Sequence, residues 1–243
     1  MKWPFQSRIV RYRRPSPRGF VTADSMSLEG IVEHIKKYVG DPATVLHEIV
    51  SEYVHIDVHV IAPRPDRDFY TLITSGMSDK PMATPKQVKG RGFEFAELML
   101  CLPSTWNVAN YSIVSDESSE KDWPVLWLKQ LARFPHQYKT WLWWGHSMPN
   151  GDPAVPLASD TELCGWLLME PKLVPDGFKV LKRPDGGNVV FFAAVPIYRE
   201  EMETKVKEGA ERLGELFDEF KVTELVDPKR VNVGAQGQRA SIH

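Results

Sequence analysis

The run FEFAELMLCLP, residues 93–103, constrains the fold more than any other part of this chain of 243 residues. From Leu98 onward every position in it is apolar. A strand formed there would bury both of its faces, which is typical of a strand inside a sheet. The run therefore predicts a central strand.

The rest of the chain mixes helical and strand-like patterns without a regular βαβ alternation. Helices are predicted at residues 27–39, 43–53 and 199–220, and from Ser118 with Pro124 in the first turn to just before Phe134. Strands are predicted from Val54, at 69–74 and 163–169, and as a hairpin of 178–181 and 188–196 joined by PDGG. This mixture favours a single α+β domain over a doubly wound α/β fold.

Charge is distributed unevenly along the chain. Residues 1–23 contain six basic side chains and no acidic one, whereas the remainder has a net charge of −8. The composition predicts a disordered basic tail over 1–25, a domain over 26–228 and a flexible C-terminal tail over 229–243. The nearly neutral total argues against a general nucleic-acid binder, and no apolar run approaches the ~20 residues of a membrane span.

Two cysteines, Cys101 and Cys164, lie in apolar runs and lack the spacing of a metal site. We interpret both as buried thiols of a reducing compartment, which predicts a cytoplasmic protein.

A metal-like pattern occurs at His55, Asp57 and His59. These residues alternate along a predicted strand and project from one face. Two imidazoles and a carboxylate can bind zinc or iron, but the same face can equally be a solvated or partner-contacting surface. The nearby HEIVS at 47–51 lacks the second histidine of a zincin motif.

No pattern in the sequence predicts a catalytic site. Ser75 and Ser78 are not in a nucleophile elbow, and neither cysteine has a neighbouring base. No Gly-rich nucleotide motif follows a strand, and we expect no cofactor.

Aromatic residues are concentrated between residues 123 and 144, which contain five of the eight tryptophans. We expect Trp123, Trp127 and Trp141 to belong to the core. Trp143 and Trp144 precede a flexible turn, where burial of both rings is harder, and partly exposed tryptophan is typical of binding hot spots.

Several longer segments resemble the Suppressor of fused family. They are HEIVSEYVHIDVHVIAPRPDRDFYTLITSGMSDKPM (47–82), ELMLCLPSTW (97–106), WPVLWLKQLARFPHQYKTWLWWGHSMPNGDP (123–153) and VVFFAAVPIYREEME (189–203). The resemblance is collinear and covers about residues 28–227. It implies a central, mostly antiparallel mixed sheet flanked by helices.

The resemblance also implies a protein-binding module without catalytic activity. Animal members hold Gli-type transcription factors with a second module that this chain lacks, so we do not transfer Gli binding. Stand-alone bacterial members suggest an immunity-type inhibitor of a polymorphic toxin, and the alternative is a metal-dependent enzyme or ligand-binding protein using the His55, Asp57 and His59 face. The candidate contact residues are His55, Asp57 and His59; Thr74, Ser75, Gly76, Met77, Ser78 and Asp79; and Trp143, Trp144, Gly145 and His146.

Overall fold

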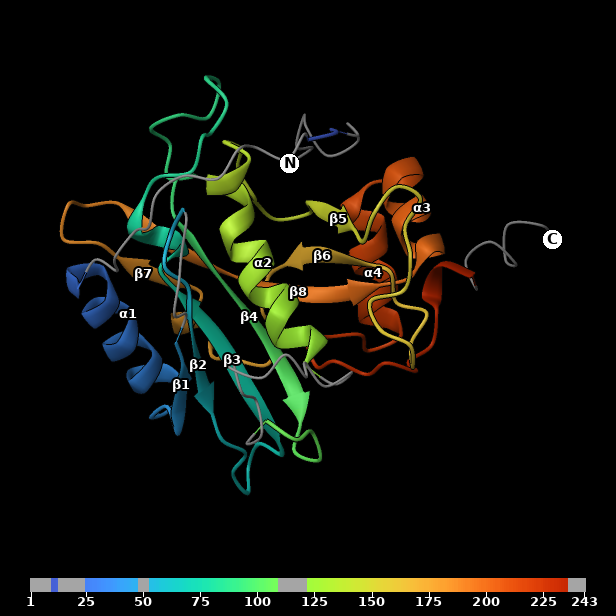
Figure 1. The fold of residues 1–243 in the computed structure, drawn as a ribbon, viewed down its shortest axis with the longest axis horizontal. Helices are drawn as coiled ribbons and strands as arrows, with labels where there is room; N and C mark the ends of the chain where they lie inside the picture. Colours follow the sequence, from blue (N-terminus) through green and yellow to red (C-terminus); the bar gives the residue numbers. More distant parts are fainter. Residues whose placement is uncertain (1–9, 13–24, 48–52, 109–121, 236–243) are drawn as a thin grey trace.

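The computed structural model describes residues 10–12, 25–47, 53–108 and 122–235. Within them, one sheet has the strand order β1-β2-β3-β4-β8-β6-β5, and β7 pairs with β8 (Figure 1). The strands are β1 (Thr44–Leu46), β2 (Asp57–Ile61), β3 (Phe69–Ser75), β4 (Ala96–Pro103), β5 (Ser147–Pro149), β6 (Gly165–Met169), β7 (Val180–Lys182) and β8 (Asn188–Ile197). The α-helices are α1 (Ser25–Tyr38), α2 (Trp123–Gln137), α3 (Arg199–Glu208) and α4 (Ala210–Glu219), and 3-10 turns occur at Met77–Asp79 and Asp176–Phe178.

Strand β4 lies in the middle of the sheet, as its apolar sequence predicts. All but the last of its residues are buried. It pairs antiparallel with β3 and parallel with β8, while the other strand pairs in the described residues are antiparallel. The predicted α+β class with a mostly antiparallel mixed sheet is therefore confirmed.

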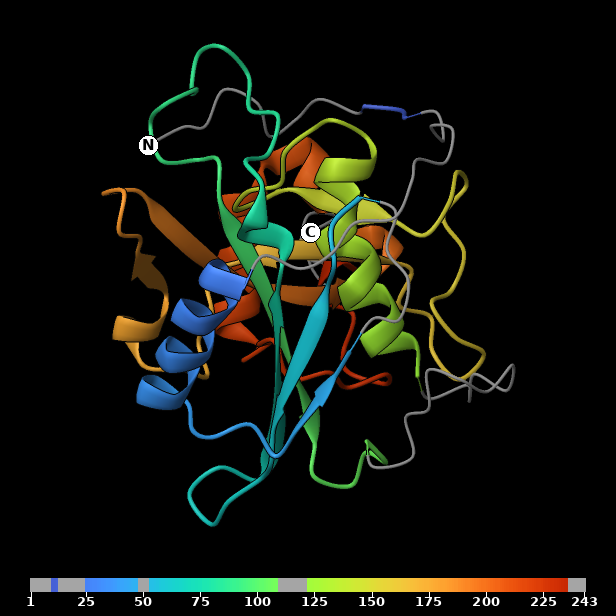
Figure 2. The same ribbon diagram turned by 60° about the vertical axis from the view of Figure 1, so that its left-hand side comes forward.

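Helices cover both faces of the sheet. Leu98 of β4 packs in one cluster with Leu128 of α2, whereas the next residue, Met99, packs in another with Ile35 of α1. Because neighbouring strand residues point to opposite faces, α1 and α2 lie on opposite sides of β4 (Figure 2). Leu213 of α4 belongs to a third cluster, built on β6 and β8.

The helix predicted over 43–53 is wrong where the structure describes it. Residues Thr44–Leu46 form the edge strand β1, whose Thr44 lies opposite Val60 of β2. The backbone N–H of Ala43 also donates to the Val60 carbonyl at 2.8 Å. Pairing with a neighbouring strand outweighs a weak local helical pattern. Residues 48–52 lie outside the described part.

Helix α2 extends past the predicted stop at Phe134. It includes Pro135 and ends at Gln137. Pro135 has no N–H to donate back to residue 131, so the helix continues past it with one backbone hydrogen bond fewer. The predicted start at Ser118 lies outside the described residues, and Pro124 occupies the first turn as expected.

The helix predicted over 199–220 is instead two helices, α3 and α4, which meet at Gly209. This glycine has φ +97°, a left-handed conformation that ends one helix before the next begins. Apolar residues continue at helical spacing on both sides of Gly209, so the sequence pattern predicts one continuous helix there.

The domain extends beyond the predicted boundary at residue 228. Both terminal nitrogens of Arg230 donate to the carboxylate of Glu201 at 2.6 Å. Val233 is fully buried in the cluster that contains α4. Residues 229–235 are thus part of the folded domain, and 236–243 lie outside the described residues.

Part of the predicted basic tail contacts the domain. The Tyr12 hydroxyl lies 2.8 Å from Oγ1 of Thr140, and its ring packs edge-on against Phe134. Arg11 forms an ion pair with Asp152 at 2.9 Å. Helix α1 begins at Ser25, while residues 1–9 and 13–24 lie outside the described residues.

Candidate functional site

The strand face formed by His55, just before β2, and by Asp57 and His59 of β2 is largely buried. His59 is 2% exposed, and its Nε2 lies 2.9 Å from Oγ of Ser75 on β3. Burial lowers the pKa of His59, since removal from water disfavours the imidazolium. His59 is therefore held inside the sheet by Ser75, and the group of potential ligand atoms that lie close together contains His55 and Asp57 but not His59.

A histidine outside the predicted pattern completes the group. Nδ1 of His47 lies 3.0 Å from Oδ2 of Asp57, and Nε2 of His55 lies 3.0 Å from Oδ1 of the same carboxylate. A carboxylate accepts hydrogen bonds, so both imidazoles donate to it. His47 directly follows β1, whose Leu46 pairs with Val58, so the strand register brings His47 opposite Asp57.

The segment TSGMSD contains the last two residues of β3 and the buried 3-10 turn that follows it. Thr74, Ser75, Met77 and Ser78 are each at most 2% exposed. His136 of α2 donates from Nε2 to the Met77 carbonyl at 2.7 Å. These side chains stabilise the turn from inside the domain. Of the six candidates in this segment, Asp79 is partly exposed.

The turn is organised around Glu97 of β4, which is fully buried. The Ser78 hydroxyl and backbone N–H donate to Oε1 at 2.6 and 2.9 Å, and the Thr74 hydroxyl donates to Oε2 at 2.6 Å. Burial raises the pKa of Glu97 to about 7, although these hydrogen bonds oppose the rise.

This raised pKa predicts that stability declines as pH increases. Between the ordinary glutamate value of 4.5 and about 7, folded Glu97 keeps a proton that the unfolded chain loses. The contribution is complete below 4.5 and lost above 7, with a size on the order of 3 kcal/mol. Urea unfolding from pH 5 to 8 should show this decline in the wild type relative to Glu97→Gln, which mimics the protonated form. Parallel pH profiles of the two proteins would contradict the assignment.

The two cysteines are buried free thiols, as expected from their apolar surroundings. Burial raises the pKa of Cys101 and also that of Cys164. Both thiols therefore stay protonated at neutral pH, which makes them poor nucleophiles.

The aromatic shelf, which we define as Phe93, Trp141, Trp143, Trp144 and His146, is partly exposed. Trp143 packs edge-on against Phe192 of β8 and lies 4.6 Å from the Phe93 ring, measured between centroids. His146 meets Trp141 edge-on at 4.8 Å. The shelf thus combines rings anchored in the core with faces that reach solvent.

Backbone pairing positions the shelf beside β6. Gly145 is buried and has φ +74°, and its backbone N–H donates to the Leu168 carbonyl at 2.7 Å. The backbone N–H of Leu168 donates in turn to the His146 carbonyl at 2.9 Å. Burial lowers the pKa of His146 to about 4, helped by the nearby positive charge of Lys205. His146 is accordingly neutral at physiological pH.

The tryptophans predicted to form the core divide into two groups. Trp123 is buried at 5% exposure, whereas Trp127 and Trp141 are partly exposed and pack against the same cluster. Trp144 contacts two clusters, one built on the α2 side and one built on α4. Exposure therefore does not separate Trp127 and Trp141, which we expect in the core, from Trp143 and Trp144.

Family comparison agrees with the architecture. The family model for Suppressor of fused protein matches residues 52–231, well over half of the chain. The chain belongs to the Suppressor of fused family. This confirms the resemblance seen in its longer segments. Among curated proteins, none matches the chain by sequence.

Solved structures related to Suppressor of fused share this fold. A homolog from Neisseria gonorrhoeae has a TM-score of 0.58 at 15% identity, over 86% of this chain and 98% of that one. A chain of the Sufu–Fu complex has a TM-score of 0.60 at 15% identity, over 89% and 96%. Drosophila Suppressor of Fused has a TM-score of 0.59 at 16% identity, over 89% of this chain and 53% of that one. Among the residues described here, no helix meets the length and hydropathy of a membrane span.

Proposed function

We propose that this Suppressor of fused domain is a non-catalytic inhibitor of a protein partner, of the immunity type that neutralises a polymorphic toxin in the cytoplasm. The observation that carries the proposal is the aromatic shelf, whose partly exposed rings are held rigidly by the core. Rigid tryptophans lose little conformational entropy on binding and are enriched at hot spots. The Sufu–Fu structure, in which a related fold occurs in a complex, supports a protein partner.

The proposed contact surface starts from Trp143, Trp144 and His146. Asp79 and His55 are further candidates, because each is partly exposed. The buried Thr74, Ser75, Met77 and Ser78 act indirectly in this proposal, by fixing the turn that ends at Asp79. Asp57 and His59 are likewise buried, so we place them beneath the contact surface.

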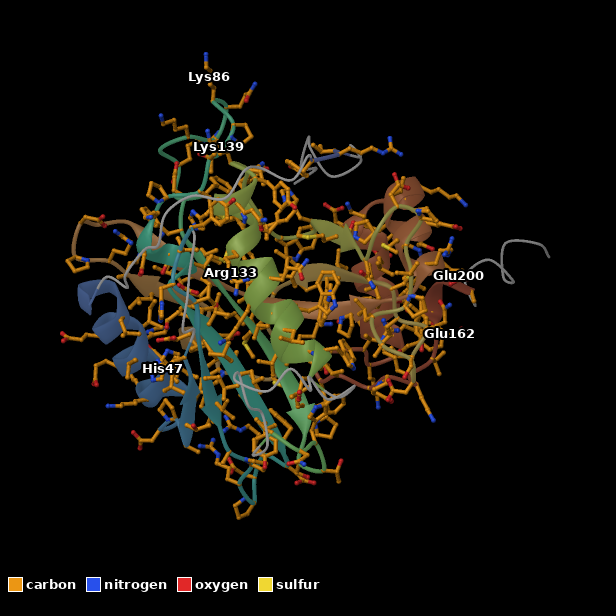
Figure 3. The ribbon with its side chains drawn as sticks, in the orientation of Figure 1. His47, Lys86, Arg133, Lys139, Glu162 and Glu200 are labelled. Atoms are coloured by element: carbon orange, nitrogen blue, oxygen red, sulfur yellow. The ribbon has the colours of Figure 1, made fainter. Side chains whose placement is uncertain are left out.

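Charge supports a basic partner such as a nuclease toxin. Helices α3 and α4, residues 199–219, contain eight acidic and four basic side chains. Glu162 and Glu200 lie on this side of the molecule, whereas Lys86 and Lys139 lie at another end (Figure 3). A separated acidic region accelerates the encounter with a positively charged partner.

A binding measurement tests the proposal directly. The proposal predicts a toxin gene beside this one; its purified toxin domain should bind the wild type by calorimetry, and co-expression should protect cells from it. Lack of binding at micromolar concentrations would refute the immunity role. Protection should not require this protein to convert a substrate, because the proposed inhibitor acts by binding to the toxin and blocking it.

The variant Trp143→Ala is expected to weaken that binding by about thirtyfold, the loss typical of a hot-spot tryptophan. Trp143→Phe keeps a ring against Phe192 and controls for lost packing. Phe220→Ala removes an exposed ring just after α4 and should leave affinity unchanged. Equal affinity of Trp143→Ala and wild type would exclude the shelf as the contact surface.

A further inference from the structure

Three potential metal ligands meet at the edge of the sheet. They are Nδ1 of His47, Nε2 of His55 and a carboxylate oxygen of Asp57, and all lie within 4.8 Å of one another. They come from the two sides of the connection between β1 and β2, with His47 on the β1 side (Figure 3). Two neutral imidazoles and one carboxylate form a ligand set suited to zinc.

We propose that His47, His55 and Asp57 bind one Zn²⁺ ion. This set differs from the pattern His55, Asp57 and His59 in the sequence. The strand register exchanges the deeply buried His59, which contacts Ser75, for His47.

A tetrahedral ion at this site requires the three ligand atoms to move closer together. Zinc bonds of about 2.0–2.2 Å place neighbouring ligand atoms about 3.3 Å apart. Each histidine nitrogen now lies 3.0 Å from an oxygen of Asp57. The two nitrogens face different oxygens of Asp57, and the three ligand atoms are spread over up to 4.8 Å, so an ion requires the imidazoles to converge on one carboxylate oxygen.

Exposure also suits metal entry. The side chain of His47 is 67% exposed, that of His55 19% and that of Asp57 4%. Asp57 is fixed at the beginning of β2 and anchors the site, whereas His47 can rotate to admit the ion. Because the His47 side chain is mostly exposed, solvent water can supply the fourth ligand.

The ion would act as a clip between strands. His47 directly follows β1 and Asp57 begins β2, so the ion would link the ends of two paired strands. Binding to the folded state alone raises thermal stability by mass action. The role is structural and does not involve the aromatic shelf, although His55 is also a candidate contact residue for the proposed partner.

Zinc titration of untagged, chelator-treated protein tests the site. Calorimetry should give one Zn²⁺ per chain, and the melting temperature should rise by several degrees with excess zinc. In His47→Ala, zinc affinity should fall by more than about tenfold and the thermal shift should disappear. Because His47 is exposed, this variant should fold, and its far-UV circular dichroism verifies that.

Two controls separate this site from adventitious binding. His243→Ala removes a histidine at the other end of the sequence and should leave both measurements unchanged. Cobalt(II) should give the intense visible absorption of a tetrahedral site in the wild type and lose it in His47→Ala. The proposal is overturned if the wild type binds no zinc, or if His47→Ala binds zinc as tightly as the wild type; the His–Asp–His group would then be a hydrogen-bond network alone.

Discussion

Replacing Gly76 by alanine is expected to destabilise the domain by about 4 kcal/mol or more, a large fraction of the stability of an ordinary domain. A Cβ atom at this position would lie 1.8 Å from the carbonyl oxygen of His55. Gly76 also has φ +100°, which L side chains rarely adopt. The clash involves backbone, so it cannot be relieved by rotating a side chain. Urea unfolding, or the soluble fraction if the variant does not fold, measures the effect.

A second glycine separates the clash from the backbone conformation. Gly90 has φ +74°, and a Cβ atom added there would meet no atom within 4 Å. Gly90→Ala should therefore cost only the left-handed penalty of about 1 kcal/mol. If the two variants were equally stable, close approach between Gly76 and His55 would not be the constraint in this turn.

Substituting Arg230 by methionine is expected to cost about 3–5 kcal/mol, because it leaves a buried carboxylate without its partner. Glu201 is fully buried and receives both terminal nitrogens of Arg230. Arg230 also donates to the Pro196 carbonyl at 2.8 Å and lies over the Tyr198 ring. One side chain thus connects the C-terminal segment with β8 and the beginning of α3. The free energy of unfolding in urea measures the loss.

A double substitution distinguishes two causes of destabilisation: loss of the Arg230–Glu201 attraction, and burial of the Glu201 charge without a cation. Adding Glu201→Gln to Arg230→Met removes the uncompensated charge and should recover part of the stability. Lys229→Met, at an exposed neighbouring position, should change stability by less than about 0.5 kcal/mol. An Arg230→Met variant as stable as Lys229→Met would show that residues 229–235 do not stabilise the domain.

The strand pattern was the most predictable part of the fold. Strand β4, the β7–β8 hairpin and the first helix follow from local periodicity, because burial repeats every two residues in a strand and every three or four in a helix. Predictions failed where a distant contact decides the local structure. Strand β1 forms because β2 is beside it, and residues 229–235 are ordered because Glu201 attracts Arg230.

The candidate site was less predictable for the same reason. Period-two spacing placed His55, Asp57 and His59 on one face, but it carried no information about depth within the sheet. His59 is buried against Ser75, while His47 reaches Asp57 from the edge strand. Similarly, the polar residues of TSGMSD suggest a surface loop, yet the buried carboxylate of Glu97 accounts for them.

The parallel pairing of β4 with β8 has a consequence for how the domain folds. Strands β1–β4 form one antiparallel unit and β5–β8 another, and each contains mainly contacts between segments close in sequence. The two units meet where Ala96–Met99 of β4 pair with Val190–Ala193 of β8. These paired segments are far apart in sequence, and α2 lies in the chain between them. Bringing β4 and β8 together closes this long loop, which costs entropy before their contacts form. We therefore expect each half to form early and the pairing of β4 with β8 to be the slow step of folding. During synthesis, the apolar edge of β4 must remain unpaired until β8 has been made.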